Sequence, residues 1–302
     1  MEMLTKLITE KQNPKSLQLD QMSIMESLHL MNQEDQKIAY AVAKVLPSIE
    51  KVIEKVVECF NRGGRLFYVG AGTSGRIGIL DSVECPPTFS TPYEQVQAVM
   101  AGGEKAINIA TEGVEDQEIF GRTDLQEKDL TEKDVVIGIA ASGRTPYVIG
   151  ALKYAQEIGA VTVSLSSNIN SELSHYSGYP IEIETGPEVL TGSTRLKAAT
   201  AHKMVLNMIS TISMVQIGKV YRNYMVDVKA SNHKLRERAK SIVSEATDVS
   251  YEEAEKALKE TKFQVKPAIV MLITDEPIEQ VESALIETKG FVKDAIQLLL
   301  KT

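Results

Sequence analysis

The sequence predicts an α/β protein in which helices cover a five-stranded parallel sheet, with further helices before the sheet and a small helical bundle after it. Five short apolar runs rich in β-branched residues predict the strands, and they alternate with helix-compatible segments. Such alternation is typical of parallel strands joined by crossover helices. An internal repeat near the C-terminus predicts the bundle. The expected strands are 65–70, 96–100, 135–141, 161–165 and 180–184.

Residues 1–62 are expected to form an arm and then helices ahead of the sheet. The first 16 residues are polar, as in an arm, and the residues after them carry apolar side chains at helical spacing. Pro47 is expected to open the last of these helices, because proline fits the first helical turn. Gly63 and Gly64 are expected to end it.

Residues 63–222 are expected to form the sheet domain, and two of its strands lead into turns of similar composition. RLFYVGAGTSGR (65–76) and VVIGIAASGRTPY (135–147) each pass from an apolar run through small residues to a hydroxyl residue followed by Gly-Arg. Backbone N–H groups and hydroxyls at the start of a helix are suited to bind phosphate. A third hydroxyl turn lies in GPEVLTGSTRLKAAT (186–200). The candidate phosphate-binding residues are Gly72, Thr73, Ser74, Ser142, Gly143, Thr145 and Ser193.

Two other interpretations of these turns stay open at this point. Residues 70–75 match the GxGxxG pattern of dinucleotide sites, in which Glu104 would bind the ribose. Ser142 and Thr145 could also serve only as helix caps. The repeat of the hydroxyl-Gly-Arg pattern favours a phosphomonoester, because its three acceptor oxygens need several donors. We therefore expect a pocket for a phosphorylated small molecule.

Residues 195–219 predict a long helix whose apolar residues run nearly all the way round it. One sheet can cover only one side of such a helix, and the helices before the sheet could cover more. We expect a homodimer in which a second copy covers the remainder, because a two-fold dimer is the commonest soluble oligomer. Lys203, or a residue near it, is then expected to approach the phosphate pocket of the partner.

Residues 223–302 form the last expected region and contain a duplication. The segment 251–273 aligns with 278–300 at an offset of 27. Neither copy of such a helix-turn-helix unit can bury its apolar face alone, so the two are expected to pack as a bundle of the ubiquitin-associated kind. We favour a packing role without a ligand. The aligned identities include Ala257 with Ala284, Glu260 with Glu287, and Thr261 with Thr288.

The composition excludes several classes of protein. The net charge of −8 argues against nucleic acid or an anionic membrane as partners, although not against a small anion. Cys59 and Cys85 are the only cysteines, which excludes a disulfide framework and a cysteine-rich metal site. We see no secretory signal pattern and no membrane-spanning apolar run, and we expect a cytoplasmic protein.

Carboxylates that could act as acids or bases occur in two places. Glu84 precedes Pro86 and Pro87, which are expected to end the helix and to stiffen the chain beyond the carboxylate. The segment EGVEDQEI holds Glu115 in a cluster of acids that could equally be a solvated helix start. The cluster also contains Glu112, Asp116 and Glu118. The four histidines have no metal-ligand spacing, so we expect no metal site.

Together these motifs make the sequence recognisable. Several segments closely resemble the N-acetylmuramic acid 6-phosphate etherases. These segments are GAGTSGRIGILDSVECPPTF, AGG followed by EGVEDQE, AASGRTPYV, TGSTRLKAATAHKMVLNMIST and GKVYRNYMVDVKASNHKL. These enzymes belong to the sugar isomerase (SIS) domain superfamily and are related to the glucokinase regulatory protein. The resemblance covers about residues 5 to 300 and implies a SIS-type sheet domain.

The resemblance also implies a lyase that needs no cofactor and acts in the recycling of cell-wall amino sugars. Such an enzyme cleaves the ether between the lactyl group and carbon 3 of the sugar phosphate by elimination and then hydration. Carried over to this chain, the catalytic carboxyls are Glu84, which protonates the departing lactate, and Glu115, which removes the proton at carbon 2. The order of the two roles is less firmly implied than the pair.

Three other functions compete with this one. An aldose–ketose isomerase of the SIS type would use similar turns and one base. A phosphosugar sensor would keep the turns and need no catalytic carboxyls. A transcriptional version should add a basic helix-turn-helix, and residues 17–62 are not markedly basic. Release of lactate from muramic acid 6-phosphate separates the etherase from all three.

Overall fold

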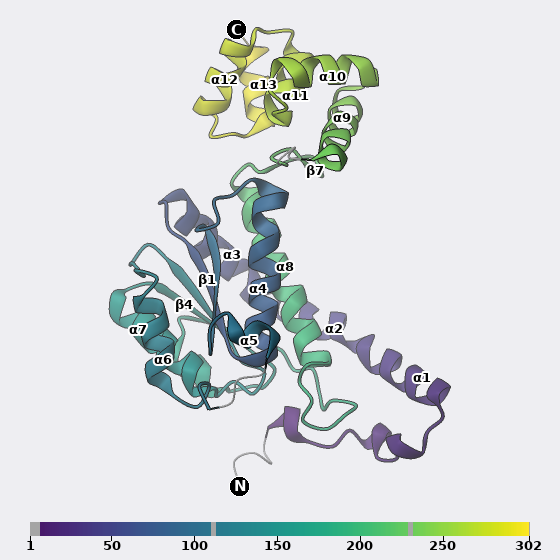
Figure 1. Cartoon of the computed structure of the whole chain (residues 1–302), viewed down its shortest axis with the longest axis vertical. Coiled ribbons are helices and arrows are strands. Elements are labelled where there is room, and N and C mark those ends of the chain that lie inside the picture. Colours follow the sequence, from purple (N-terminus) through teal and green to yellow (C-terminus); the bar gives the residue numbers. More distant parts are fainter. Residues whose placement is uncertain (1–6, 110–112, 229–231, 302) are drawn as a thin grey trace. The chain divides into compact units, whose positions relative to one another are not determined.

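The computed structural model describes residues 7–109, 113–228 and 232–301 (Figure 1). The chain forms two units, each of which is described by itself. The first unit contains Met1–Val83 and Glu94–Ser210, and the second contains Glu84–Tyr93 and Thr211–Thr302. Among the described residues, no helix is both long and apolar enough to cross a membrane.

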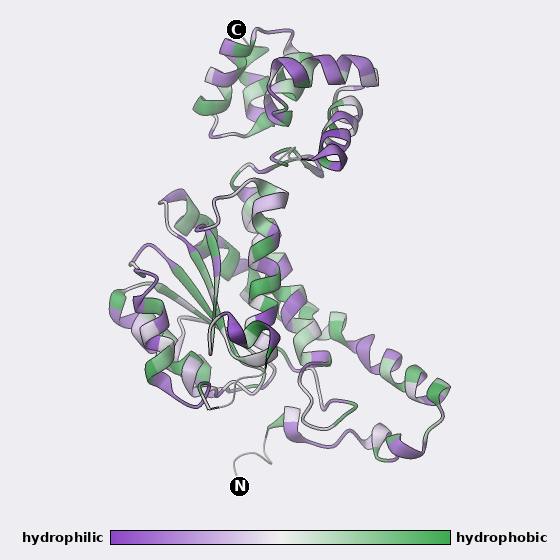
Figure 2. Ribbon diagram, viewed as in Figure 1, coloured by the Kyte–Doolittle hydropathy of each residue, from purple (hydrophilic) through white to green (hydrophobic). Residues whose placement is uncertain are grey.

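A five-stranded sheet is the centre of the first unit, and all of its strands are parallel, as predicted. The strand order is β2-β1-β3-β4-β5. Every residue of β1 and β3 is buried, and apart from Tyr68 and the glycines these residues are hydrophobic on the scale used in Figure 2. Gly70 pairs with Met100 on one side and with Ile139 on the other, so three strands end at the same edge. The strands are β1 (Leu66–Gly70), β2 (Val96–Met100), β3 (Val135–Ile139), β4 (Val161–Ser166) and β5 (Tyr179–Glu182).

Helices cover both faces of this sheet. Gly138 of β3 leaves room for α7, because a Cβ at Gly138 would lie 2.7 Å from Cγ1 of Val148. On the opposite face of β1, the Tyr68 hydroxyl donates a hydrogen bond to Asp81 of α4 at 2.8 Å. The helices that lie wholly or mainly in this unit are α1 (Ile24–Asp35), α2 (Lys37–Ala43), α3 (Leu46–Asn61), α4 (Gly72–Phe89), α5 (Lys105–Asn108), α6 (Glu118–Gln126), α7 (Pro146–Ile158) and α8 (Lys197–Gln216). The unit also contains the short 3-10 turns η2 (Ile8–Glu10), η3 (Pro14–Ser16), η4 (Leu19–Gln21) and η5 (Glu172–Tyr176).

Two expected helix boundaries had opposite outcomes. Pro47 lies in the first turn of α3, and Gly63 follows the end of that helix with a φ of 72°, as predicted. The expectation that Pro86 and Pro87 end their helix is wrong, because α4 continues to Phe89. The two prolines remove only the amide donors of the last turn, and the N–H of Ser90 still donates to the carbonyl of Pro86 at 2.9 Å.

The second unit contains a short hairpin and five helices among its described residues. The two copies of the predicted repeat form α10–α11 and α12–α13, and both contribute to one hydrophobic core. Each copy ends its first helix in the same way, because Thr261 and Thr288 donate their hydroxyls to Ala257 and Ala284 at 3.1 and 2.8 Å. The elements are β6 (Val220–Tyr221), β7 (Tyr224–Met225), α9 (His233–Thr247), α10 (Tyr251–Glu260), α11 (Val265–Thr274), α12 (Ile278–Glu287) and α13 (Val292–Leu299).

Candidate active site

The turns after β1 and β3 meet at the carboxyl edge of the sheet and enclose a cavity of about 210 Å³. Parallel sheets of this kind usually bind ligands at this edge. None of the described residues that line the cavity is a lysine or arginine, so hydroxyls and main-chain N–H groups are its donors. The lining residues are Glu10, Ala71, Gly72, Thr73, Ser74, Glu115, Ala140, Ala141, Ser142, Thr145, Thr194, Ala199 and His202.

The first turn presents the start of α4 to the cavity. The helix begins at Gly72, so the N–H groups of Gly72, Thr73 and Ser74 have no carbonyl partner within the helix. The N–H of Gly75 is the first that bonds back, to the carbonyl of Ala71 at 3.3 Å. Three consecutive N–H groups beside two hydroxyls form a wall that suits an anion.

The second turn adds two more hydroxyls, and neither is used as a helix cap. Thr145 is the N-cap residue of α7, but its side chain makes no capping hydrogen bond. In the described part of the chain, the Ser142 hydroxyl likewise has no hydrogen-bond partner. The interpretation of these two residues as caps therefore fails, and their hydroxyls are available to a ligand.

Gly143 supports the second turn and does not line the cavity. Its φ is 73°, and a Cβ there would lie 2.3 Å from the Cβ of Ser171, so only glycine fits. Its carbonyl accepts the N–H of Leu173 at 2.9 Å, which fixes the turn to the segment after β4. The role that the structure gives Gly143 is conformational.

The third turn contributes Thr194 to the cavity, whereas its neighbour Ser193 is not among the lining residues. The fully buried carboxylate of Glu188 holds this turn, because it accepts the N–H groups of Lys197 and Ala198 at the start of α8, both at 3.0 Å. Burial raises the pKa of Glu188, and the two N–H groups oppose that rise. Sequence reasoning missed Glu188, which lies in an ordinary loop.

His202 lies on the buried face of α8 and forms part of the cavity wall. Its Nε2 is 3.0 Å from the Ser167 hydroxyl, and its Nδ1 has no hydrogen-bond partner among the described residues. Burial lowers the pKa of His202 to about 4, so the ring is neutral near pH 7. The sequence offered only a lone histidine within an apolar stripe.

The two predicted catalytic carboxyls lie in different surroundings. Glu115 precedes α6 and lines the cavity, and its carbonyl accepts the N–H of Tyr147 at 3.0 Å. Glu84 is exposed on the last part of α4, in the second unit, and is not among the lining residues. Lys203 is exposed on α8 and is also not among them. Glu112 lies outside the described residues.

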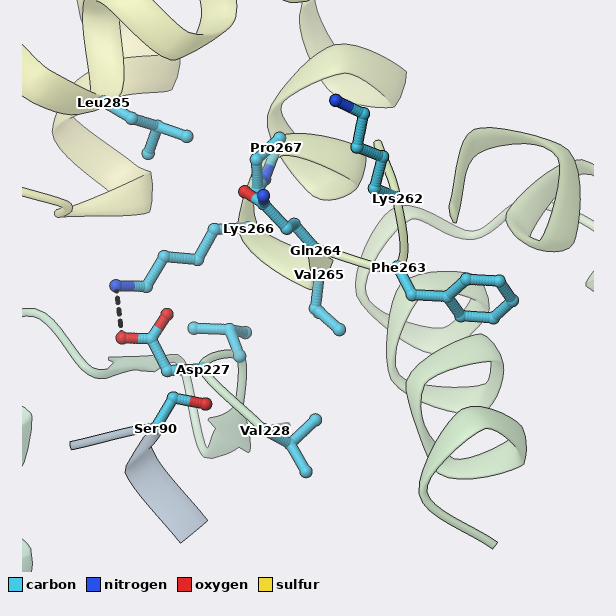
Figure 3. A pocket seen from close by; sticks show the side chains of 11 residues that line it. Ser90, Asp227, Val228, Lys262, Phe263, Gln264, Val265, Lys266, Pro267 and Leu285 are labelled. Carbon is cyan, nitrogen blue, oxygen red and sulfur yellow. Dashed lines mark hydrogen bonds and ion pairs between the residues drawn. The ribbon is translucent and has the colours of Figure 1, made fainter. Parts of the chain in front are cut away.

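The second unit has a larger cavity, of about 510 Å³, beside the turn between α10 and α11 (Figure 3). Two of its charged residues, Lys266 and Asp227, pair with each other. Lys266 donates to Asp227 at 2.8 Å, as the dashed line in Figure 3 marks, and Lys219 reaches the same carboxylate at 3.0 Å. The described lining of this cavity also includes the exposed Lys262, whereas no lysine or arginine is among the described residues that line the cavity at the edge of the sheet.

Comparisons with known proteins match almost the whole chain. The N-terminal SIS domain of the glucokinase regulatory protein matches residues 48–156, the SIS domain matches 111–212, and the C-terminal lid domain of the glucokinase regulatory protein matches 222–300. The N-acetylmuramic acid 6-phosphate etherase of Lactococcus lactis subsp. cremoris (strain SK11) is 58% identical over 265 residues, which cover 88% of this chain and 89% of that protein. The etherase of Geobacillus thermodenitrificans (strain NG80-2) is 60% identical over 270 residues, which cover 89% and 92%.

Solved structures are similar in fold at lower identity. A Bacteroides fragilis protein described as a phosphosugar isomerase involved in capsule formation has a TM-score of 0.53 and 20% identity, over 70% of this chain and 98% of its own. A phosphoheptose isomerase from Francisella tularensis has a TM-score of 0.50 and 17% identity, over 64% and 100%. At this identity the likeness extends to the fold alone.

Proposed function

The chain belongs to the N-acetylmuramic acid 6-phosphate etherase family, and from this premise we propose how its residues carry out the reaction. It is a carbon–oxygen lyase that cleaves the D-lactyl ether of N-acetylmuramic acid 6-phosphate. The products are N-acetylglucosamine 6-phosphate and D-lactate. The structural feature that best supports a phosphosugar substrate is the cavity that two turns line with hydroxyls and N–H groups, which have no partner among the residues that the structure describes.

The phosphate is proposed to bind to these donors. Thr73, Ser74, Ser142 and Thr145 each supply a hydroxyl to the cavity, and the start of α4 supplies N–H groups. A phosphate monoester has three terminal oxygens, each of which accepts more than one hydrogen bond. An anchored phosphate restricts the remainder of the substrate, and such positioning can lower a reaction barrier by roughly 7–11 kcal/mol.

The chemistry is proposed to proceed by elimination and then addition of water. Glu115 takes the proton from carbon 2, which the open-chain aldehyde at carbon 1 makes acidic. The electron pair forms a double bond between carbons 2 and 3 while the bond from carbon 3 to the ether oxygen breaks. Glu84 gives its proton to that oxygen, and lactate leaves. Water then adds its hydroxyl to carbon 3 and a proton to carbon 2.

A homodimer in the cytoplasm is the proposed working form. The sequence pointed to α8 as the apolar surface that a second copy covers, but the chain itself buries Val205, Leu206 and Ile209 of that helix. The larger uncovered apolar surface is on α1, where Ile24 is 82% exposed and Leu28 is 54% exposed. These two residues lie one helical turn apart, so they share a face that a second copy would cover.

Incubation with N-acetylmuramic acid 6-phosphate in H2¹⁸O tests the reaction. The etherase releases D-lactate, and the label enters the hydroxyl at carbon 3 of the sugar product, because lactate keeps the ether oxygen. Formation of a ketose phosphate would indicate an isomerase, and binding without turnover would indicate a sensor. Either result would overturn the proposed function.

A further inference from the structure

A second carboxylate residue, besides Glu115, lines the cavity, and it comes from the arm that precedes the α-helices. Glu10 closes the 3-10 turn η2, and its Oε2 lies 3.4 Å from the point where a Cβ on Gly192 would stand. Gly192 belongs to the turn that supplies Thr194 to the same cavity. Within the described part of the chain, the Glu10 carboxylate has no hydrogen bond and no ion pair.

The arm is tied firmly to the turns of the cavity. The Asn168 side chain accepts the N–H of Ile8 at 2.7 Å and donates to the hydroxyl of Thr9 at 3.1 Å. The same amide group donates to the carbonyl of Ala141, in the second turn, at 3.0 Å. Thr9 is fully buried. The position of Glu10 therefore follows from contacts with the cavity wall rather than from an unattached terminus.

A second anchor holds the other end of the arm. The Asn13 side chain donates to the carbonyl of Pro187 at 3.2 Å and accepts the N–H of Lys15 at 3.0 Å. Pro187 precedes Glu188, whose carboxylate holds the start of α8. Both ends of the segment that carries Glu10 are thus bonded to loops at the edge of the sheet.

The cavity is consequently lined by two chemically different sets of groups. The hydroxyls of Thr73, Ser74, Ser142 and Thr145, which we call the hydroxyl wall, can donate, and Glu10 and Glu115 add carboxylates to the same lining. An ionised carboxylate only accepts hydrogen bonds, and it repels a phosphate dianion. A substrate with an anionic end and an end rich in O–H and N–H donors matches these two sets of groups.

We propose that Glu10 is a substrate-binding residue that accepts a hydrogen bond from a hydroxyl or the acetamido N–H of the sugar. This inference rests on the proposed function. The contact orients the sugar so that its phosphate lies against the hydroxyl wall. Glu10 takes no part in the bond changes, and its effect is on the choice of ligand and on the position of the sugar.

Calorimetric titration of the full chain with two ligands tests the proposal. The ligands are N-acetylglucosamine 6-phosphate and inorganic phosphate, and the variants are Glu10→Ala and a control, Glu50→Ala, at an exposed position of α3. A hydrogen bond to a charged group corresponds to a change in affinity of about 10- to 150-fold. We expect Glu10→Ala to weaken the binding of the sugar phosphate by that factor and to leave the affinity for inorganic phosphate unchanged or slightly higher. Glu50→Ala should change neither affinity.

Two other outcomes for Glu10→Ala overturn the proposal. Equal weakening of both ligands by Glu10→Ala would indicate a structural role, and no change would show that Glu10 does not contact the sugar. Thr9→Val loosens the arm at similar side-chain volume and should also weaken the binding of the sugar phosphate. The double variant Thr9→Val with Glu10→Ala should then lose little further affinity. Additive losses would contradict the anchoring role of the arm. Failure of the unaltered protein to release lactate would instead overturn the proposed function.

Discussion

The carboxylate of Glu188 accepts the main-chain N–H of Lys197 at 3.0 Å and so closes the loop that leads into α8. The next N–H, of Ala198, binds the other carboxylate oxygen at 3.0 Å. A buried acid at the start of a helix satisfies donors that would otherwise have no partner. The loop that it closes contains Thr194, one of the cavity-lining residues.

Glu188→Ala should lower the free energy of unfolding by about 2–3 kcal/mol, because it removes a buried cap and two hydrogen bonds to a charged group. Urea unfolding at pH 7 measures the change. Affinity for sugar phosphate should fall in parallel, because Thr194 loses its support. Glu184→Ala, at an exposed position four residues earlier, is the control and should change neither. A stability equal to that of the control would contradict the capping role.

The hydroxyl wall can be tested at the second turn. Ser142→Ala and Thr145→Val each remove one donor, and a hydrogen bond to a charged group contributes about 1.5–3 kcal/mol. We expect each variant to bind N-acetylglucosamine 6-phosphate at least about tenfold more weakly, with little effect on the weak binding of unphosphorylated N-acetylglucosamine. An equal fall in affinity for both ligands would mean that the turn acts only in folding.

The proposed acid and base can be separated by isotope exchange. Glu84→Gln and Glu115→Gln should each lower lactate release by about 100-fold or more, the effect typical of lost acid–base catalysis. Both side chains are exposed, so folding should be unchanged. In D2O, Glu84→Gln should still exchange the proton at carbon 2, whereas Glu115→Gln should not. The opposite pattern would reverse the assigned roles.

A buried cluster around Glu34 predicts how stability depends on pH. Burial favours the neutral acid, but hydrogen bonds from Lys37 and Lys197 outweigh burial and lower the pKa of Glu34 to about 2. A carboxyl whose pKa is lower in the folded state stabilises the fold above its unfolded pKa of about 4.5, and this stability is lost as the pH falls toward 2. Unfolding free energies measured from pH 6 to pH 3 should therefore decline more steeply for the unaltered protein than for Glu34→Gln. Parallel pH profiles would show that Glu34 is not held ionised by the two lysines.

The sequence allowed the fold to be predicted well because strands and turns are local properties. β1 was expected at 65–70 and lies at Leu66–Gly70, since a short apolar run bounded by turn residues needs no distant information. The position of Glu10 was not predictable in this way. The neighbouring Ile8 is anchored by Asn168, which lies 160 positions away, and neither residue belongs to a periodic pattern. Glu188 was missed for the same reason, because a loop carboxylate becomes a cap only when the chain folds back to it.

The proposed dimer can be tested on α1, whose exposed face is apolar. Ile24→Asp with Leu28→Asp places charges on that face, while the capping box of Ser23 and Glu26 at the start of α1 stays intact. Charges buried without partners disfavour association strongly, so the double variant should dissociate. Sedimentation at micromolar concentration should give about twice 33.2 kDa for the unaltered protein and about 33.2 kDa for the variant.

Ile24→Ala with Leu28→Ala is the matched control and should shift the monomer–dimer equilibrium much less. A fully active species of the single-chain mass would contradict the dimer, and a double variant that stays dimeric would place the interface elsewhere than α1.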